Sequence, residues 1–157
     1  MRKEKKFIIS IDQGTTSSRA ILFNLKGQPV YSSQKEFTQY FPKSGWVEHD
    51  PEEIWLTTKK TLNDVIKKSK KIKGKILTIG ITNQRETTVL WNKKTGEAVY
   101  NAIVWQDRRQ EEFCKKLRKQ NKETLIFNRT GLLIDSYFSG TKIKWILDNI
   151  PLAKKLM

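Results

Sequence analysis

The sequence predicts an α/β fold with a mixed sheet, and three observations lead to it. The first 37 residues contain two apolar, strand-like runs, 7–11 and 19–23, and a third extended segment at 30–37, separated only by short polar turns. This spacing is typical of an antiparallel meander and not of a βαβ unit. An amphipathic helical stretch follows, and after it comes a nearly continuous apolar run, which adds a helix and a buried strand to the meander.

A helix is predicted after a loop at 40–47, which contains a proline and a glycine. Asp50 suits the N-cap, Pro51 suits the first helical position, and Glu53 stands three residues after the cap, as in a capping box. We expect this helix to end near Gly74. Its predicted buried face consists of residues at helical spacing: Ile54, Trp55, Thr58, Leu62, Val65 and Ile66.

The middle of the chain predicts two more strands. Residues 76–81 are almost entirely apolar, which is typical of a strand buried on both faces. A polar segment at 83–86 separates this strand from a second one at 87–91. A turn at 92–96 then leads into extended chain towards Trp105.

The last third of the chain is predicted to be mainly helical. We expect one helix to begin near Asp107 and to run to about Leu117. The pair Thr130–Gly131 resembles a helix end, because glycine suits the position after the last helical turn. A final helix is predicted around the apolar residues of 143–147.

Composition excludes several classes of protein. Cys114 is the only cysteine and His49 the only histidine, so one chain cannot build a disulfide framework or a Cys- or His-based zinc site. A Ser-His-Asp triad is likewise disfavoured. No apolar run is long enough to cross a bilayer, and the basic start lacks the long apolar segment of a secretory signal. We therefore expect a cytoplasmic protein without a membrane span.

The net charge of +15 raises the question of nucleic-acid binding. Only seven of the 31 basic residues are arginines, whereas nucleic-acid grooves favour arginine and interleave it with aromatic side chains. The densest basic run, 67–75, falls at the end of a predicted helix, where lysines suit the helix dipole and the solvent. A lysine-rich solvated surface is favoured, and no nucleic-acid partner is expected.

The segment 12–19, DQGTTSSR, has the chemistry of a phosphate holder, although it is neither a Walker A loop nor a GxGxxG motif. Gly14 allows a tight turn that brings N–H groups close to an anion. An ordinary polar hairpin turn is the alternative. The side chains that would serve a phosphate and its metal are the carboxylate of Asp12 for Mg²⁺, the hydroxyls of Thr15, Thr16 and Ser17, and the guanidinium of Arg19.

Arg85 and Glu86 are the second pair of candidates, at the carboxyl end of the strand predicted at 76–81. One donates and the other accepts hydrogen bonds, so together they could fix the hydroxyls of a small polyol. A solvated charged hairpin is the alternative. Trp105 and Tyr137 could form an apolar wall for a short carbon skeleton, and core packing is the alternative for both.

These segments together resemble one family. DQGTTSSR at 12–19 resembles the first phosphate motif of the FGGY carbohydrate kinases, and the similarity continues over nearly the whole chain. NQRET at 83–87, NAIVWQ at 101–106 and SYFSGTK at 136–142 resemble the glycerol kinases within that family. Two further matching stretches are YFPKSGWVEHDPEEIW at 40–55 and TGLLIDSYFSGTKIKWIL at 130–147.

The resemblance implies a ribonuclease-H-like, actin-type ATPase fold, in which a mixed sheet is flanked by helices. Residues 1–157 would form an incomplete first domain, its amino-terminal part, with the second domain absent. ATP, Mg²⁺ and glycerol are the implied cofactors and substrate. By motif position, the nucleotide would be contacted by Thr15, Thr16, Ser17 and Arg19, and Thr15 would also lie close to the transferred phosphate. Asp12 would serve Mg²⁺. Glycerol would be bound by Arg85, Glu86, Trp105 and Tyr137.

Two departures from the family affect the expected function. Ser136 occupies a position where proline is common in the family, which would loosen the loop that presents Tyr137. The family's chains also continue into a second domain that supplies the general-base aspartate, so no catalytic residue is expected in this chain. We expect little or no kinase activity from it alone, and a complementing carboxy-terminal chain as a partner. A non-catalytic relic, a glycerol-binding module, or a fragment of another FGGY polyol or sugar kinase are the alternatives.

Overall fold

The structure is a computed structural model that describes residues 5–156. The chain forms two compact units, which are made of discontinuous stretches of sequence. The first unit consists of residues 1–38 and 52–84, and we call it the hairpin unit. The second consists of residues 39–51 and 85–157, and we call it the helical unit.

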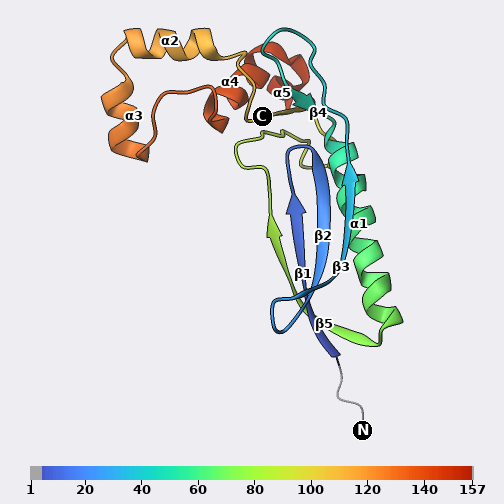
Figure 1. Ribbon diagram of the computed structural model, residues 1–157. Helices are drawn as coiled ribbons and strands as arrows, with labels where there is room; N and C mark the ends of the chain where they lie inside the picture. The colour runs from blue at the N-terminus through green and yellow to red at the C-terminus, as the bar shows by residue number, and fades with distance from the viewer. Residues whose placement is uncertain (1–4, 157) are drawn as a thin grey trace. The chain divides into compact units, whose positions relative to one another are not determined.

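A four-stranded mixed sheet forms the hairpin unit, with the strand order β3-β2-β1-β5 (Figure 1). The first three strands, β1 (Lys5–Gln13), β2 (Ser17–Asn24) and β3 (Pro29–Glu36), pair in antiparallel fashion and confirm the predicted meander. The fourth strand, β5 (Gly74–Thr82), pairs with β1 in parallel. The predicted mixed sheet is therefore present.

Helix α1 (Pro51–Lys71) covers one face of this sheet and begins at the proline, as predicted. The buried core between them consists of Phe7, Ile9, Ile11, Ala20, Leu22 and Val65. The carboxylate of Glu53 accepts hydrogen bonds from the backbone N–H of Thr38 at 3.1 Å and from its hydroxyl at 3.0 Å. These bonds tie the end of the meander to the first turn of the helix.

The predicted buried face of α1 was partly wrong, because Trp55 is 55% exposed. The helix instead buries a stripe of mainly hydroxyl-bearing residues, Thr57, Thr61, Val65 and Ser69. Thr57 tolerates burial because its hydroxyl donates to the carbonyl of Glu53 at 2.8 Å and shares a hydrogen bond with Ser18 at 2.9 Å. Apolar periodicity cannot identify such a stripe, since its hydrogen bonds depend on a neighbouring strand.

The end of α1 shows why glycine follows it. The helix ends at Lys71, Lys73 takes a left-handed φ of 54°, and β5 begins at Gly74. A Cβ on Gly74 would collide with the ring of Phe7. The predicted helix end near this glycine is therefore confirmed, and close packing against β1 requires it.

Strand β5 differs from its prediction as a strand buried on both faces. Leu77, Ile79 and Ile81 are 47%, 43% and 74% exposed, respectively. Among the described strands, β5 pairs only with β1, so its outer edge has no neighbour. The core side chains that α1 covers lie mainly on β1 and β2, and Ile76 is the β5 residue packed against them, so within residues 5–156 the other apolar side chains of β5 are left largely uncovered.

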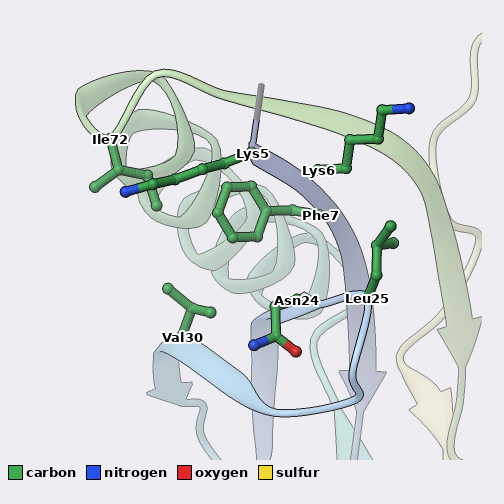
Figure 2. Close-up of a pocket in the computed structure, with 7 residues that line it drawn as sticks. All are labelled: Lys5, Lys6, Phe7, Asn24, Leu25, Val30 and Ile72. Atoms are coloured by element: carbon green, nitrogen blue, oxygen red, sulfur yellow. The ribbon is translucent and has the colours of Figure 1, made fainter. Parts of the chain in front are cut away.

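The end of the four-stranded sheet where β1 begins contains a hollow of about 790 Å³. Figure 2 shows its lining, which comes from the start of β1, the end of β2 and the turn after it, the start of β3, and the residue that follows α1. The lining residues are Lys5, Lys6, Phe7, Asn24, Leu25, Val30 and Ile72. None of the residues predicted to bind phosphate belongs to it.

Up to residue 156, the helical unit contains a two-stranded sheet and four helices. Strand β4 (Glu48–His49) pairs with β6 (Ala102–Ile103) in antiparallel fashion. The helices are α2 (Glu111–Lys119), α3 (Glu123–Thr130), α4 (Ser139–Asn149) and α5 (Pro151–Lys155). Gly131 ends α3 with a left-handed φ of 71°, as predicted. Ile103, Ile146 and Ala153 form the buried core of this unit.

The strand predicted at 87–91 is wrong, because this segment forms only isolated bridges. Thr88 exchanges backbone hydrogen bonds with Ile103, whereas Leu90 accepts one from Val99. The register shifts between these two pairings, and this shift interrupts a regular ladder. The apolar, β-branched composition of the segment could not show this shift.

A buried ion cluster connects separate segments of the helical unit. The guanidinium of Arg109 lies 2.7 Å from a Glu48 oxygen and 2.9 Å from an Asp107 oxygen, and all three side chains are at most 3% exposed. The Cζ atom of the same guanidinium lies 3.9 Å from the ring centroid of Trp46 and 4.5 Å from that of Trp145. The cluster therefore fixes β4, the segment after β6 and helix α4 to one another.

No helix within residues 5–156 is long and apolar enough to cross a membrane.

Candidate functional site

The hairpin between β1 and β2 carries the predicted phosphate motif. Its turn closes with a hydrogen bond from the N–H of Gly14 to the carbonyl of Ser17 at 3.0 Å. A Cβ on Gly14 would lie 3.2 Å from that carbonyl oxygen, so glycine suits this tight turn best. The N–H of Phe37 donates to the carbonyl of Thr16 at 3.3 Å and supports the turn from the end of β3.

Asp12 and Arg19 lie opposite each other across the two strands that flank this turn. Their side chains form an ion pair at 3.3 Å, and each is about two-fifths exposed. The Nε of Arg19 is nevertheless buried without a hydrogen-bond partner in the described structure. A partly exposed arginine with an unsatisfied donor is suited to an anion, because buried donors without partners are costly.

The three predicted hydroxyl donors differ in their surroundings. Thr16 is exposed and Thr15 is half-buried. Ser17 is buried, and its hydroxyl accepts a hydrogen bond from the side chain of Gln34 at 2.9 Å. The hydroxyl hydrogen of Ser17 is not used in this bond and could serve a ligand, whereas the threonine side chains lie closer to solvent.

Asp12 supplies the carboxylate of this motif. No group of three or more His, Cys, Asp or Glu side chains that could hold a metal ion occurs in residues 5–156. This donor set still fits Mg²⁺, because that ion keeps several waters and is bound through one or two carboxylates together with substrate phosphates. Ca²⁺ and Zn²⁺ require more protein ligands than this turn offers.

The helical unit contains the residues predicted to bind a polyol. Glu86 takes a left-handed φ of 65°, and its carboxylate accepts hydrogen bonds from the N–H and the hydroxyl of Ser139 at 2.8 and 2.7 Å. The hydrogen bond from the Ser139 hydroxyl, with smaller contributions from the backbone N–H, Lys142 and Arg85, lowers the pKa of Glu86 below its ordinary value. Glu86 is thus an ionised acceptor at the start of α4, where the helix dipole also favours negative charge.

Trp105 and Tyr137, predicted as an aromatic wall, lie together. Their ring centroids are 5.9 Å apart in an edge-to-face arrangement, and both side chains are half-buried. The N–H of Tyr137 donates to the carboxylate of Asp135 at 2.7 Å, and the N–H of Trp105 donates to the hydroxyl of Thr87 at 3.3 Å. Arg85 is exposed beside Glu86 in the sequence. The helical unit therefore offers a carboxylate, a guanidinium and an aromatic pair.

Ser136, which stands where proline is common in the family, is hydrogen-bonded on both its side chain and its carbonyl. The residue is 1% exposed. Its hydroxyl accepts a hydrogen bond from Arg108 at 3.2 Å, and its carbonyl accepts one from the ammonium group of Lys142 at 3.0 Å. Side-chain hydrogen bonds thus hold this loop.

Sequence reasoning missed Ser139 and Lys142. Lys142 is 1% exposed, although lysine is among the residues least often buried. One signal was present in the sequence: Phe138, Lys142 and Ile146 recur at intervals of four, so a helix places the lysine on the same face as two apolar residues. Ser139 gave no such signal, because its contact with Glu86 joins positions far apart in the chain.

Comparison with solved structures defines the class of fold. A crystal structure of Plasmodium falciparum glycerol kinase with ADP matches 97% of this chain with a TM-score of 0.91 at 37% identity, and the match covers 30% of that chain. A gluconate kinase from Lactobacillus acidophilus matches with a TM-score of 0.87 at 24% identity, which bears on the fold alone. The fold is that of the actin-like ATPases, as the sequence resemblance implied.

The chain belongs to the FGGY family of carbohydrate kinases, whose N-terminal domain matches residues 7–157. A glycerol kinase from Oceanobacillus iheyensis is 60% identical over 151 residues, or 96% of this chain and 30% of that protein. A glycerol kinase from Malacoplasma penetrans is 57% identical over 153 residues, or 98% of this chain and 30% of that protein. The chain thus spans about 30% of the length of the curated relatives it matches.

Proposed function

We propose that this chain is the amino-terminal portion of a glycerol kinase, which phosphorylates glycerol with ATP to give ADP and sn-glycerol 3-phosphate. The observation that carries the proposal is a set of residues in the helical unit: Ser139 holds ionised Glu86, and two residues before Ser139 stands Tyr137, whose ring contacts Trp105. A three-carbon alcohol needs hydrogen-bond acceptors for its hydroxyls and an apolar surface for its carbons, and this group provides both. The identity of about 60% to glycerol kinases supports the same substrate.

In this proposal the helical unit binds and orients glycerol. Glu86 accepts a hydrogen bond from one hydroxyl, and Arg85 donates to another. The Tyr137 hydroxyl adds a further contact, while Trp105 packs on the carbon skeleton. Because Ser139 already donates two hydrogen bonds to Glu86, the carboxylate is oriented before the substrate arrives.

The hairpin unit binds the nucleotide's phosphates in this proposal. Arg19 and the hydroxyls of Thr15 and Thr16 donate to phosphate oxygens, Ser17 donates through its remaining hydrogen, and Thr15 also serves the transferred group. Asp12 holds Mg²⁺ through water. When bound, Mg²⁺ neutralises charge that develops on the phosphate oxygens during transfer. The buried unpaired Nε of Arg19 and the tight turn at Gly14 support this assignment.

Transfer also requires a general base and a closed cleft, and we assign both to the part of the kinase that relatives carry outside the matched segment. The exposed apolar residues of β5 and its unpaired edge support this assignment, because a parallel strand of this composition is normally covered. We propose that a complementing polypeptide covers β5, and that the chain alone turns over little glycerol. General-base loss by itself costs about 10²–10⁴-fold in rate.

We propose the cytoplasm as the place of action. The lone Cys114 is fully buried, and burial raises the pKa of its thiol above the ordinary value. Such a thiol is unreactive and needs no partner cysteine, which suits a reducing compartment.

Coupled measurement of ADP release tests the proposal. The chain is assayed with ATP, Mg²⁺ and glycerol, alone and mixed with the part of the Oceanobacillus iheyensis glycerol kinase that lies outside its matched segment. Little ADP release is expected from the chain alone, and glycerol-dependent release from the mixture. Fast turnover by the chain alone would refute the assignment of the base to the other part.

Binding can be tested separately from turnover. Calorimetric titration with glycerol should give a binding heat for the wild-type mixture and a much smaller one for Arg85→Ala. Arg129→Ala, which removes an exposed arginine from the end of α3, is the matched control and should bind as the wild type does. Equal heats from Arg85→Ala and the wild type would remove Arg85 from the site. A stronger response to xylulose or gluconate than to glycerol would favour another FGGY sugar kinase.

A further inference from the structure

Lys142 is a buried cation for which the proposed function has no direct use. It lies in the first turns of α4 and is 1% exposed. Its ammonium group donates to the carbonyl of Ser136 at 3.0 Å and to the carbonyl of Tyr137. Burying an ammonium group is costly unless it is paired and hydrogen-bonded, so these two contacts need a reason.

The two carbonyls belong to the loop that presents Tyr137. This loop is held from its outer side by Arg108, which bonds the carboxylate of Asp135 at 3.0 Å and the hydroxyl of Ser136 at 3.2 Å. Lys142 holds it from within, at backbone atoms that have no partner in a regular helix or strand. The loop is thus bonded by two cations, the exposed Arg108 and the buried Lys142.

The charges around Lys142 come from several segments of the helical unit. Three carboxylates, Glu86, Asp107 and Asp135, favour its charged form, whereas Arg108 disfavours it. Burial outweighs the carboxylates and lowers the pKa of Lys142 to about 8. The group therefore remains largely protonated at neutral pH, and it places a positive charge near Glu86 and 6.0 Å from the ring centroid of Tyr137.

We propose that Lys142 is a positioning residue for polyol binding: its ammonium group fixes the backbone of Ser136 and Tyr137, and thereby keeps the Tyr137 ring against Trp105 and Ser139 on Glu86. The proposal rests on the proposed function, because it assigns Lys142 to the same polyol site. It also explains how the loop keeps its shape with serine at position 136, where a proline ring would otherwise restrict the backbone.

Hydrogen exchange tests the positioning role without any ligand. In Lys142→Met, the amides of Tyr137 and Ser139 should exchange about tenfold faster or more, while the amide of Ile103 in the core keeps its rate. Lys144→Met is the matched control, since Lys144 lies on the same helix, is 45% exposed, and contacts Asp148 and the Phe113 ring but neither carbonyl of the loop. Unchanged exchange at Tyr137 and Ser139, or an equal increase at Ile103, would overturn the proposal.

A pH series separates positioning by the hydrogen bonds of the Lys142 amine from mere filling of space. In the wild-type chain, protection of the Tyr137 amide, corrected for the intrinsic pH dependence of exchange, should rise as the pH passes about 8, because the closed loop favours the neutral amine and an opening that exposes Lys142 must take up a proton. Lys142→Met should show no such step, and a step of equal size in that variant would overturn the proposal. Should Lys142→Met fail to fold, Lys142→Arg keeps the charge and should retain the protection without the step.

Glycerol affinity is the third readout, measured in the mixture with the complementing part. Lys142→Met should weaken glycerol binding by about tenfold, and Lys144→Met should leave it unchanged. Glycerol binding that survives Lys142→Met undiminished would refute the positioning role. If the wild-type mixture does not bind glycerol, the proposed function fails, whereas the exchange data still decide whether Lys142 fixes the loop.

Discussion

The carboxylate of Glu86 accepts two hydrogen bonds from a single residue, Ser139, one from its N–H and one from its hydroxyl. The two residues are 53 positions apart in sequence. Ser139 is the first residue of α4, and Glu86 is bonded to it there. This contact joins the NQRET and SYFSGTK segments, which identified the family from sequence, into one arrangement. A carboxylate held in this way can present its other oxygen to a ligand.

Removing the Ser139 hydroxyl should therefore raise the pKa of Glu86. Ser139→Ala keeps the backbone bond but loses the larger contribution to the shift, so the pKa should move up towards 4.5. A folded-state pKa below the unfolded value contributes stability above pH 4.5 that is lost as pH falls through the folded pKa, and the variant should lose part of this contribution. NMR titration of the Glu86 side chain measures the change, and an unaltered midpoint would contradict the prediction.

The buried guanidinium of Arg109 should contribute strongly to the stability of the helical unit. Arg109→Met leaves Glu48 and Asp107 buried without their cation, which typically costs about 3–5 kcal/mol. Burial alone would raise the pKa of Glu48, but hydrogen bonds from Tyr100, Arg109 and Asn101 hold it below its ordinary value.

Urea unfolding measures the effect of Arg109→Met. The control is Lys115→Met, which breaks an exposed pair with Glu112 and should leave the free energy of unfolding nearly unchanged. If both variants unfold at the same urea concentration, the buried cluster does not stabilise the helical unit.

Stability should rise with pH above about 8 because of Lys142. Its folded-state pKa of about 8 lies below the ordinary 10.5, so between these values the unfolded chain binds the extra proton. The free energy of unfolding therefore increases over this window, by roughly 3 kcal/mol if the full shift is realised. Urea unfolding at pH 7.5, 9 and 10.5 measures it. In Lys142→Met this contribution should be absent, and an equal rise in that variant would assign it to other groups.

A charge on the exposed strand should separate complementation from folding. Ile81 is 74% exposed, so Ile81→Asp should change the stability of the chain itself by only about 0.5 kcal/mol. The same change should abolish ADP release in the mixture, because it places a carboxylate where we propose an apolar partner. Leu25→Asp, at a residue that is 60% exposed beyond β2, is the matched control and should leave complementation intact. Loss of activity in both variants would point away from β5.

The local elements could be predicted from sequence where one short segment determines its own structure. The meander followed from its turns, the start of α1 from Pro51, and the end of α3 from Gly131. Trp55 was assigned to a buried face because apolar periodicity does not register hydroxyl groups that bond across to a strand. The exposure of β5 could not be predicted from the composition of the strand itself, since burial depends on a covering layer.

In the candidate site, too, some residues could be identified from sequence and others could not. Glu86, Trp105 and Tyr137 could be found from motifs, and the structure places the two aromatic rings in contact. Lys142 could not be given a role, because the two carbonyls that it contacts carry no signal in the sequence. Ser136 was expected to loosen the loop because the hydrogen bonds that it makes likewise carry no signal in the sequence. They come from Arg108 and Lys142, which lie on either side of it in sequence.

The ion pair between Asp12 and Arg19 has a consequence for the order of events at the hairpin. While the two side chains neutralise each other, neither offers its full charge to a ligand. An anion that draws Arg19 away leaves Asp12 ready for a cation, and a cation at Asp12 releases Arg19. The arrival of either should therefore tighten the binding of the other, and by thermodynamic reciprocity the factor is the same in both directions.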